Sequence, residues 1–164
     1  TLTLTSYMLL LGGIVKNFEE GYKLCEKKIA DGSAYKKFLE MVEWQGGKAD
    51  IVDNILAIHK SKYTMDVKAD EGGYVQEIKT AEMGLCNAFL GAGRTKLDES
   101  IDPHSGIVLY KKVGDKIEKG EPLCRIYTDK ENWKLIAKEI KKCFIIGPQK
   151  VKRPKLIKEI LGWA

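Results

Sequence analysis

The feature that most constrains the fold is a change in the spacing of apolar residues near residue 61. Upstream, apolar residues recur every three or four positions, and the predicted helix over 49–58 has the stripe Ile51, Ile55 and Ile58. Downstream, Tyr63–Ala69 alternates like a half-buried strand. The sequence therefore predicts an α+β chain, with a helical segment at 1–60 and a compact, β-rich module at 61–164.

Capping residues indicate where the early helices begin and end. Asn17, followed three residues later by Glu20, forms a capping box that predicts a helix over Phe18–Ala30. Ser33 is expected to cap the next helix. Gly46–Gly47 is expected to end it, because glycine readily takes the left-handed conformation that closes a helix.

Short strands and two helices make up the predicted module. The expected strands are Tyr63–Ala69, Tyr74–Ile78, Gly106–Tyr110, Lys116–Ile117 and Pro122–Tyr127. One helix is expected over Ala81–Leu90. A second, over Glu131–Phe144 with Thr128 or Asp129 as its N-cap, should pack across the sheet through an apolar stripe that contains Trp133, Ile136 and Ile140.

Composition narrows the class of protein. The chain has 164 residues with a net charge of +5 and no apolar run of the ~18–20 residues that a membrane span needs. Its basic C-terminal stretch has Lys at helical spacing without aromatic platforms, so we expect a solvated helix face rather than nucleic-acid binding. The four cysteines lack short pair spacing, and we expect reduced core thiols in a cytoplasmic protein.

Motifs for catalysis are absent from the sequence. The only imidazoles, His59 and His104, have no metal ligands at suitable spacing, so no metal site is predicted. Gly91-Ala92-Gly93-Arg94 follows a helix instead of opening one, so its amides cannot form the phosphate cradle of a helix N-terminus. A backbone turn is the simplest interpretation of this segment, and Gly91 and Gly93 are expected to allow it by taking a positive φ.

One stretch is similar to a lipoyl-domain hairpin. In Val113–Leu123, Gly114 and Gly120 allow tight turns, and Thr128-Asp129-Lys130 follows. A lipoylated lysine needs a hairpin tip, whereas Lys130 is followed by a predicted helix. A lipoyl- or biotinyl-like carrier or binding module therefore remains the alternative hypothesis.

Residues 47–160 together resemble the C-terminal part of the pyrimidine nucleoside phosphorylase and thymidine phosphorylase family. The segments that carry the resemblance are Gln45–Gly47, Ala69–Val75, Leu90–Arg94, Ile101–Ile107, Val113–Leu123, Pro148 and Arg153–Pro154, with Ile157. The resemblance implies a hammerhead-like β module related to barrel-sandwich hybrids, without a modified lysine. Because the chain opens at Thr1 within an apolar helix, we expect a C-terminal fragment of a larger enzyme.

The resemblance also implies a reaction and its partners. The family transfers a pentosyl group by reversible phosphorolysis of pyrimidine nucleosides in nucleotide salvage. Phosphate is the co-substrate, no cofactor is expected, and the intact enzyme is expected to be a homodimer. The phosphate- and base-binding groups are expected upstream of this chain, so it contributes no catalytic residue and is expected to be inactive alone. Gly91, Gly93 and Arg94 are the candidates for the edge of the substrate cleft.

Overall fold

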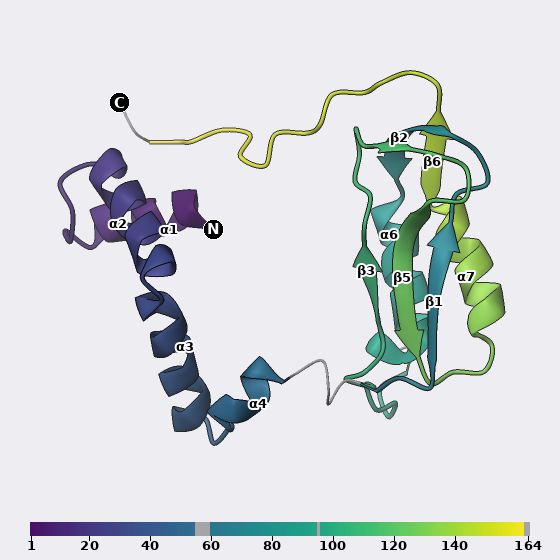
Figure 1. Ribbon diagram of the computed structural model, residues 1–164, viewed down its shortest axis with the longest axis horizontal. Helices are drawn as coiled ribbons and strands as arrows, with labels where there is room; N and C mark the ends of the chain where they lie inside the picture. Colours follow the sequence, from purple (N-terminus) through teal and green to yellow (C-terminus); the bar gives the residue numbers. More distant parts are fainter. Residues whose placement is uncertain (55–59, 95, 163–164) are drawn as a thin grey trace. The chain divides into compact units, whose positions relative to one another are not determined.

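The computed structural model describes residues 1–54, 60–94 and 96–162. The chain divides into two compact units, Thr1–Ile58 (unit 1) and His59–Ala164 (unit 2) (Figure 1). Together they give the α+β class that the sequence predicts, with short helices and two small antiparallel sheets.

Unit 1 is helical throughout its regular elements. These are α1 (Leu2–Leu11), α2 (Phe18–Ala30), α3 (Ser33–Trp44) and α4 (Ala49–Asp53). The capping box of α2 is confirmed, because Oδ1 of Asn17 accepts a hydrogen bond of 2.9 Å from the Glu20 amide. The Glu20 carboxylate reaches back one residue further than usual and accepts from the Lys16 amide at 3.0 Å.

The boundaries of α3 match the prediction at one end only. Ser33 is the first helical residue and does not cap, because Gly32 is the N-cap and Oδ1 of Asp31 accepts from the Ser33 amide. At the other end Gly46 has a φ of +79°, and the Gly47 amide bonds to the Val42 carbonyl at 2.8 Å. This Schellman closure confirms the predicted end. The predicted third helix begins at Ala49 as expected, but α4 ends at Asp53 with Asn54 as its C-cap instead of continuing. The last predicted positions, 55–58, lie outside the described residues.

A close crossing joins α1 to α2. A Cβ added to Gly21 would lie 3.0 Å from the Ser6 carbonyl oxygen, so the two backbones approach because neither residue is large. Val15 and Cys25 are the buried hydrophobic residues of this unit among the described positions. Unit 1 therefore has a small core.

Unit 2 contains two three-stranded antiparallel sheets, ordered β1–β5–β3 and β4–β2–β6. The strands are β1 (Tyr63–Lys68), β2 (Gly73–Ile78), β3 (Gly106–Leu109), β4 (Lys116–Ile117), β5 (Pro122–Thr128) and β6 (Phe144–Gly147). The five predicted strands are all present, each within one residue of its expected ends. Although β1 and β2 are consecutive in sequence, the turn between them sends them to different sheets.

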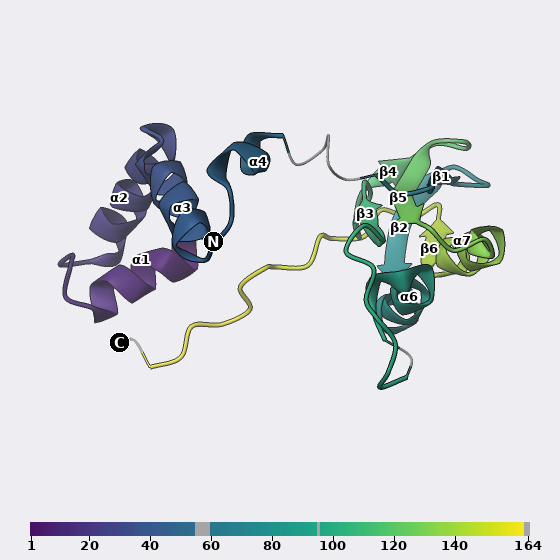
Figure 2. The same cartoon turned by 90° about the horizontal axis from the view of Figure 1, so that it is seen from below.

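Two helical segments pack with these sheets around one core. They are α6 (Thr80–Asn87), continued by the π-helical turn η1 (Ala88–Ala92), and α7 (Trp133–Lys142). Figure 2 shows α6 and α7 on one side of the β1–β5–β3 sheet. Ile136 and Ile140 are buried and Trp133 packs partly against the same cluster, which confirms the predicted packing of α7.

Three expectations about the C-terminal region are wrong. The N-cap of α7 is Asn132, because the carboxylate of Asp129 instead accepts from the Lys62 amide at 2.6 Å. The predicted helix end at Phe144 is the start of β6, which pairs with β2. Residues 148–162 form no helix, so the predicted helix face of the basic C-terminal stretch ends at Lys142.

All four cysteines are buried and unpaired, as predicted. Cys86, Cys124 and Cys143 belong to the core of unit 2, whereas Cys25 lies in α2 of unit 1. Burial raises the pKa of the Cys124 thiol to about 12, because a thiolate is poorly solvated there.

Candidate functional site

The end of η1 and the loop that follows it contain the three residues predicted for the cleft edge, with Gly91 inside η1 and Gly93 as its C-cap. Gly91 is buried with a φ of +109°, a backbone conformation that L side chains rarely adopt. A Cβ there would also lie 3.2 Å from Oγ of Ser105. The expected glycine turn is therefore confirmed at this position.

Gly93 is needed for a different reason than the one expected. Its φ of −151° is ordinary extended backbone, so the predicted positive φ at this position is wrong. A Cβ would nevertheless lie 3.0 Å from Cβ of Ala88, which means that the loop folds back tightly on η1. Gly93 is thus a site of close packing.

Asp102, in the segment before β3, anchors the Gly91–Arg94 loop. Its amide donates to the Gly91 carbonyl at 2.9 Å, which ties the segment before β3 to the end of η1. The carboxylate accepts from the His104 amide at 2.9 Å and from the Ser105 hydroxyl at 2.5 Å. The Asp-Pro sequence at 102–103 favours such a turn, and it is the one signal that could have identified Asp102 as an anchor.

Thr128 provides a second anchor, from the end of β5. Its buried hydroxyl donates to the Leu90 carbonyl at 2.5 Å and accepts from the Lys130 amide at 3.0 Å. Ser61 completes the support by donating to the His104 carbonyl at 2.6 Å. Sequence reasoning assigned Thr128 to a helix cap and gave Ser61 no role, because these bonds join positions far apart in the chain.

A hollow of about 320 Å³ lies beside this loop. Its lining residues are Ala88, Phe89, Gly91, Gly93, Asp98, Glu99, Ser100 and Lys130. Two carboxylates face one ammonium group in this set, so the lining is not suited to hold phosphate by itself. Arg94 is exposed and is not among these lining residues. The hollow can form a wall or rim, but it offers no activated nucleophile.

Lys130 does not occupy a hairpin tip. It lies in the connection between β5 and α7, and its amide bonds to the Thr128 hydroxyl. His104 lies in the turn held by Asp102, and His59 is outside the described residues. Among the positions that the structure describes, no three His, Cys, Asp or Glu residues gather as a metal site. This geometry disfavours the carrier alternative.

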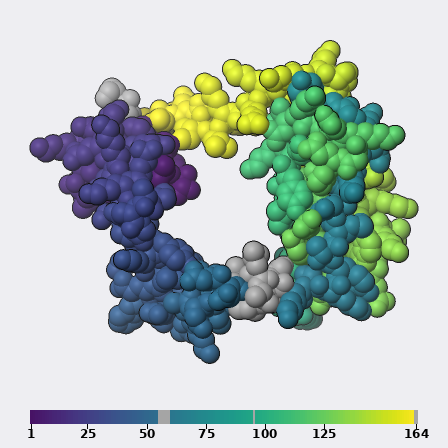
Figure 3. All heavy atoms as spheres, in the orientation of Figure 1, coloured from purple at the N-terminus to yellow at the C-terminus, as the bar shows by residue number. Residues whose placement is uncertain are grey.

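The outer face of the β1–β5–β3 sheet carries a structural ion pair. Arg125 contacts both oxygens of Asp66, with Nε–Oδ1 at 2.6 Å and Nη2–Oδ2 at 2.9 Å. This hydrogen bonding holds the pKa of Asp66 below its usual value. The guanidinium also lies 5.8 Å from the Tyr110 ring centroid. Figure 1 draws β3, β5 and β1 in front of α6 and α7, and Figure 3 shows the same side of unit 2 as spheres, so the two helices of unit 2 leave this face of the sheet uncovered.

Comparison with known proteins shows which family this chain resembles. Residues 74–147 match the model of the pyrimidine nucleoside phosphorylase C-terminal domain. Pyrimidine-nucleoside phosphorylase of Bacillus subtilis is 39% identical over 160 residues, which cover 98% of this chain and 37% of the relative. The enzymes of the same name from Geobacillus stearothermophilus and Staphylococcus aureus (strain USA300) are 36% and 34% identical, over 95% and 98% of this chain and 36% and 37% of their own lengths.

The matched region contains the elements on both sides of the candidate loop, from β2 through η1 to β6. The chain spans little more than a third of the length of these curated relatives. No helix in the described part of the chain has both the length and the apolar character needed to cross a membrane. Over almost its whole length the chain is therefore similar to a C-terminal portion of pyrimidine-nucleoside phosphorylases, and residues 74–147 match the C-terminal domain of that family.

Proposed function

We propose that this chain acts as the C-terminal part of an enzyme that catalyses the reversible phosphorolysis of pyrimidine nucleosides. Phosphate attacks the anomeric carbon, the bond to the base breaks, and the products are a pentose 1-phosphate and the free base. Phosphate is a co-substrate, and the reaction needs no further cofactor. The observation that carries the proposal is the match of residues 74–147 to the family's C-terminal domain.

The residues of unit 2 determine which part of the reaction we assign to this chain. Phosphorolysis needs donors that bind phosphate and groups that stabilise negative charge on the departing base. The hollow beside Gly91 has more carboxylates than cations, so we assign the phosphate- and base-binding groups to the remainder of the enzyme. The Gly91–Arg94 loop, anchored by Asp102 and Thr128, would form one edge of the cleft and help exclude water.

We further propose a cytoplasmic homodimer that serves nucleotide salvage. Four unpaired thiols support a reducing compartment. Exposed apolar side chains on α1 and α3 support the burial of these helices in the complete enzyme; they are Leu4, Met8, Leu11, Phe38, Met41 and Trp44. In this scheme unit 1 provides surface for association and unit 2 provides the cleft edge.

A chimera tests the assignment directly. This chain would replace the 160 aligned residues of the Bacillus subtilis enzyme, to which it is 39% identical. The chimera should convert uridine or thymidine and phosphate into a pentose 1-phosphate, whereas the 164-residue chain alone should not. A folded but inactive chimera, or product formed by the chain alone above a no-protein control, would contradict the proposal.

Loop variants in the same chimera test the cleft-edge role. Gly93→Val should lower kcat, because its side chain would collide with Ala88 and displace the loop. Gly106→Val is the matched control, since a Cβ there meets nothing within 4 Å. Arg94→Ala should lower kcat more than Lys119→Ala, which removes the same charge at the β4–β5 turn. Wild-type values of kcat and KM in both Gly93→Val and Arg94→Ala would show that the loop has no role at the substrate cleft.

The carrier alternative has its own test. After co-expression with lipoate ligase, the intact mass of the chain should be unchanged, because Lys130 is not presented at a hairpin tip. A lipoyl group on Lys130 would instead establish a carrier function.

A further inference from the structure

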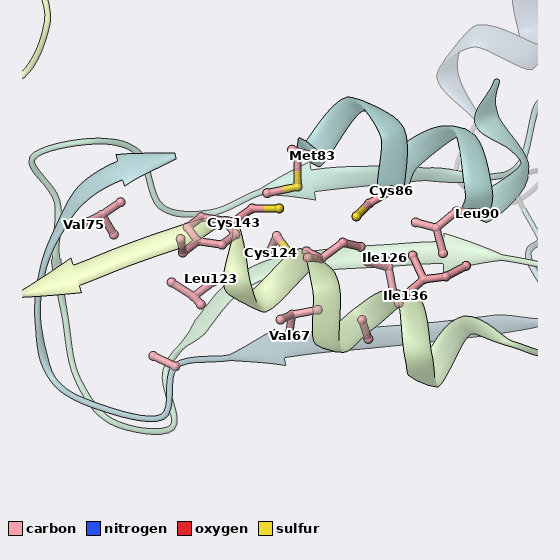
Figure 4. Packing of buried hydrophobic residues seen from close by; sticks show 14 of the residues in the cluster. Val67, Val75, Met83, Cys86, Leu90, Leu123, Cys124, Ile126, Ile136 and Cys143 are labelled. Carbon is pink, nitrogen blue, oxygen red and sulfur yellow. The ribbon is translucent and has the colours of Figure 1, made fainter. Parts of the chain in front are cut away.

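Two of the core thiols of unit 2 lie against each other. Cys86 comes from the last turn of α6, and Cys143 is the C-cap residue of α7. Figure 4 shows their sulfur atoms pointing toward one another between the two helices. Sγ of Cys143 donates a hydrogen bond of 3.3 Å to the Glu139 carbonyl oxygen. Each of the two thiols also shifts the pKa of the other, as groups in close proximity do.

The pair lies at the floor of a groove that opens to solvent. A cavity of about 590 Å³ lies between α6 and α7, and both Cys86 and Cys143 line it. Its walls include Leu85, Phe89 and Leu135, which are 62%, 55% and 66% exposed. A small molecule in this groove therefore reaches the two thiols. Cys124 is fully buried and does not line the groove.

We propose that Cys86 and Cys143 form a reversible disulfide that crosslinks α6 to the end of α7, with a low-molecular-weight disulfide as the oxidant. Cys86 is the more exposed of the two, at 8% against 3%, and reacts first. Its thiolate attacks one sulfur of the small disulfide and releases one small thiolate. The thiolate of Cys143 then attacks the Cys86 sulfur of the mixed disulfide and releases the second.

The step balances without any other reactant. The protein pair loses two electrons, which reduce the small disulfide to two thiols, and the two protein thiol protons pass to the released thiolates. Because the oxidant is supplied from solution, a reducing thiol pool keeps the pair reduced and an oxidised pool closes it. The phosphorylase assignment plays no part in this chemistry.

The pKa values of the two thiols control how fast the disulfide forms. Burial raises the pKa of Cys143 to about 11 and also raises the pKa of Cys86. Glu82 raises and Lys79 lowers the pKa of Cys143, whereas Glu139 raises that of Cys86. Thiolate is therefore scarce at neutral pH. Because its fraction rises almost tenfold per pH unit below the pKa, crosslinking should be roughly 50-fold or more faster at pH 9 than at pH 7.

The crosslink would stiffen the approach to the candidate loop. From Cys86 the chain runs through η1 directly to Gly91. Closing a loop of roughly sixty residues also restricts the unfolded chain, so the melting temperature of unit 2 should rise when the disulfide forms.

Peptide mapping of the full 164-residue chain tests this inference. Trypsin separates all four cysteines, because Cys86 falls in the peptide 80–94, Cys143 in 143–150, Cys124 in 120–125 and Cys25 in 24–27. After incubation with oxidised glutathione, the free thiols titrated in denaturant should fall from four to two. The non-reduced digest should contain peptide 80–94 linked to 143–150, and dithiothreitol should release both.

Single variants provide the controls. Cys86→Ala and Cys143→Ala should each abolish the linked peptide and leave at most a glutathione adduct. Cys124→Ala and Cys25→Ala should still lose two thiols and give the same linked peptide. Four free thiols after oxidation of the wild-type chain, or a linked peptide that contains Cys25 or Cys124, overturns the proposal.

Discussion

At the scale of single residues, replacing each of two glycines in one helical stretch by alanine should change stability in opposite directions. Gly91 has a φ of +109° and faces Ser105, whereas a Cβ at Gly84 in α6 meets nothing within 4 Å. Gly91→Ala should therefore destabilise unit 2 by about 1–2 kcal/mol or more. Gly84→Ala should stabilise it by about 0.5–1 kcal/mol. Urea unfolding followed by circular dichroism measures both, and equal effects would contradict this assignment.

The ion pair on the outer sheet face makes a residue-scale prediction about pH. Because Arg125 lowers the pKa of Asp66 in the folded state, the pair stabilises the fold above the unfolded-state pKa of about 3.8. That contribution is lost as the pH falls through the lower, folded-state pKa. Asp66→Asn should thus be less stable than wild type at pH 7, with the difference vanishing in strong acid. Asp70→Asn, at a 78% exposed side chain, should show a smaller difference.

At the scale of elements, local patterns predicted most of unit 2 and the ends of α2. Alternation identified the five expected strands, but β6 escaped because Phe144-Ile145-Ile146 continues the apolar stripe of α7. This segment forms a strand because it pairs with β2, where Phe144 lies opposite Ile78. The local spacing of apolar residues carries no information about so distant a partner. Thr128 was predicted as a helix cap for a similar reason. Its hydroxyl donates a hydrogen bond to the Leu90 carbonyl, which is too distant in the sequence for a local pattern to reveal.

The candidate site likewise contains one residue that local sequence predicted and two that it could not predict. The Gly-rich spacing pointed to Gly91, where positive φ is a local property of the backbone. The anchors Asp102 and Thr128 act through bonds to Gly91 and Leu90 from distant parts of the chain. Such long-range bonds require the folded arrangement of η1, β3 and β5, so residue spacing alone could not reveal them.

Neighbouring residues of α7 test how this helix packs. Ile136 is 7% exposed within the core, whereas Leu135 is 66% exposed on the same turn. Ile136→Asp forfeits about 1.5–3 kcal/mol of apolar burial and also places a carboxylate in the core, so unit 2 should unfold or aggregate. Leu135→Asp should keep the wild-type melting temperature within a few degrees. Unchanged melting of Ile136→Asp would show that α7 does not pack as described.

At the scale of the whole molecule, the two units differ in how much apolar surface they bury. Among the described positions, fifteen buried hydrophobic residues lie in unit 2, whereas unit 1 has Val15 and Cys25. Since apolar burial is the main favourable contribution to folding, unit 2 is the more stable of the two. The helices of unit 1 are short, and isolated helices of this length gain little stability from hydrogen bonding alone.

Amide hydrogen exchange should therefore show two levels of protection in the 164-residue chain. Amides of α1 to α3 should exchange through a low-energy opening of unit 1, well before those of β5 and α7, because each unit opens as a cooperative block. Gly21→Leu, which drives a side chain against Ser6, should speed exchange in α1 and α2 while leaving unit 2 at its wild-type rates. Gly84→Ala serves as a control that leaves unit 1 unchanged. Equal protection of α2 and β5, or faster exchange of unit 2 in Gly21→Leu, would mean that the units open together and that unit 1 draws its stability from contacts beyond its own small core.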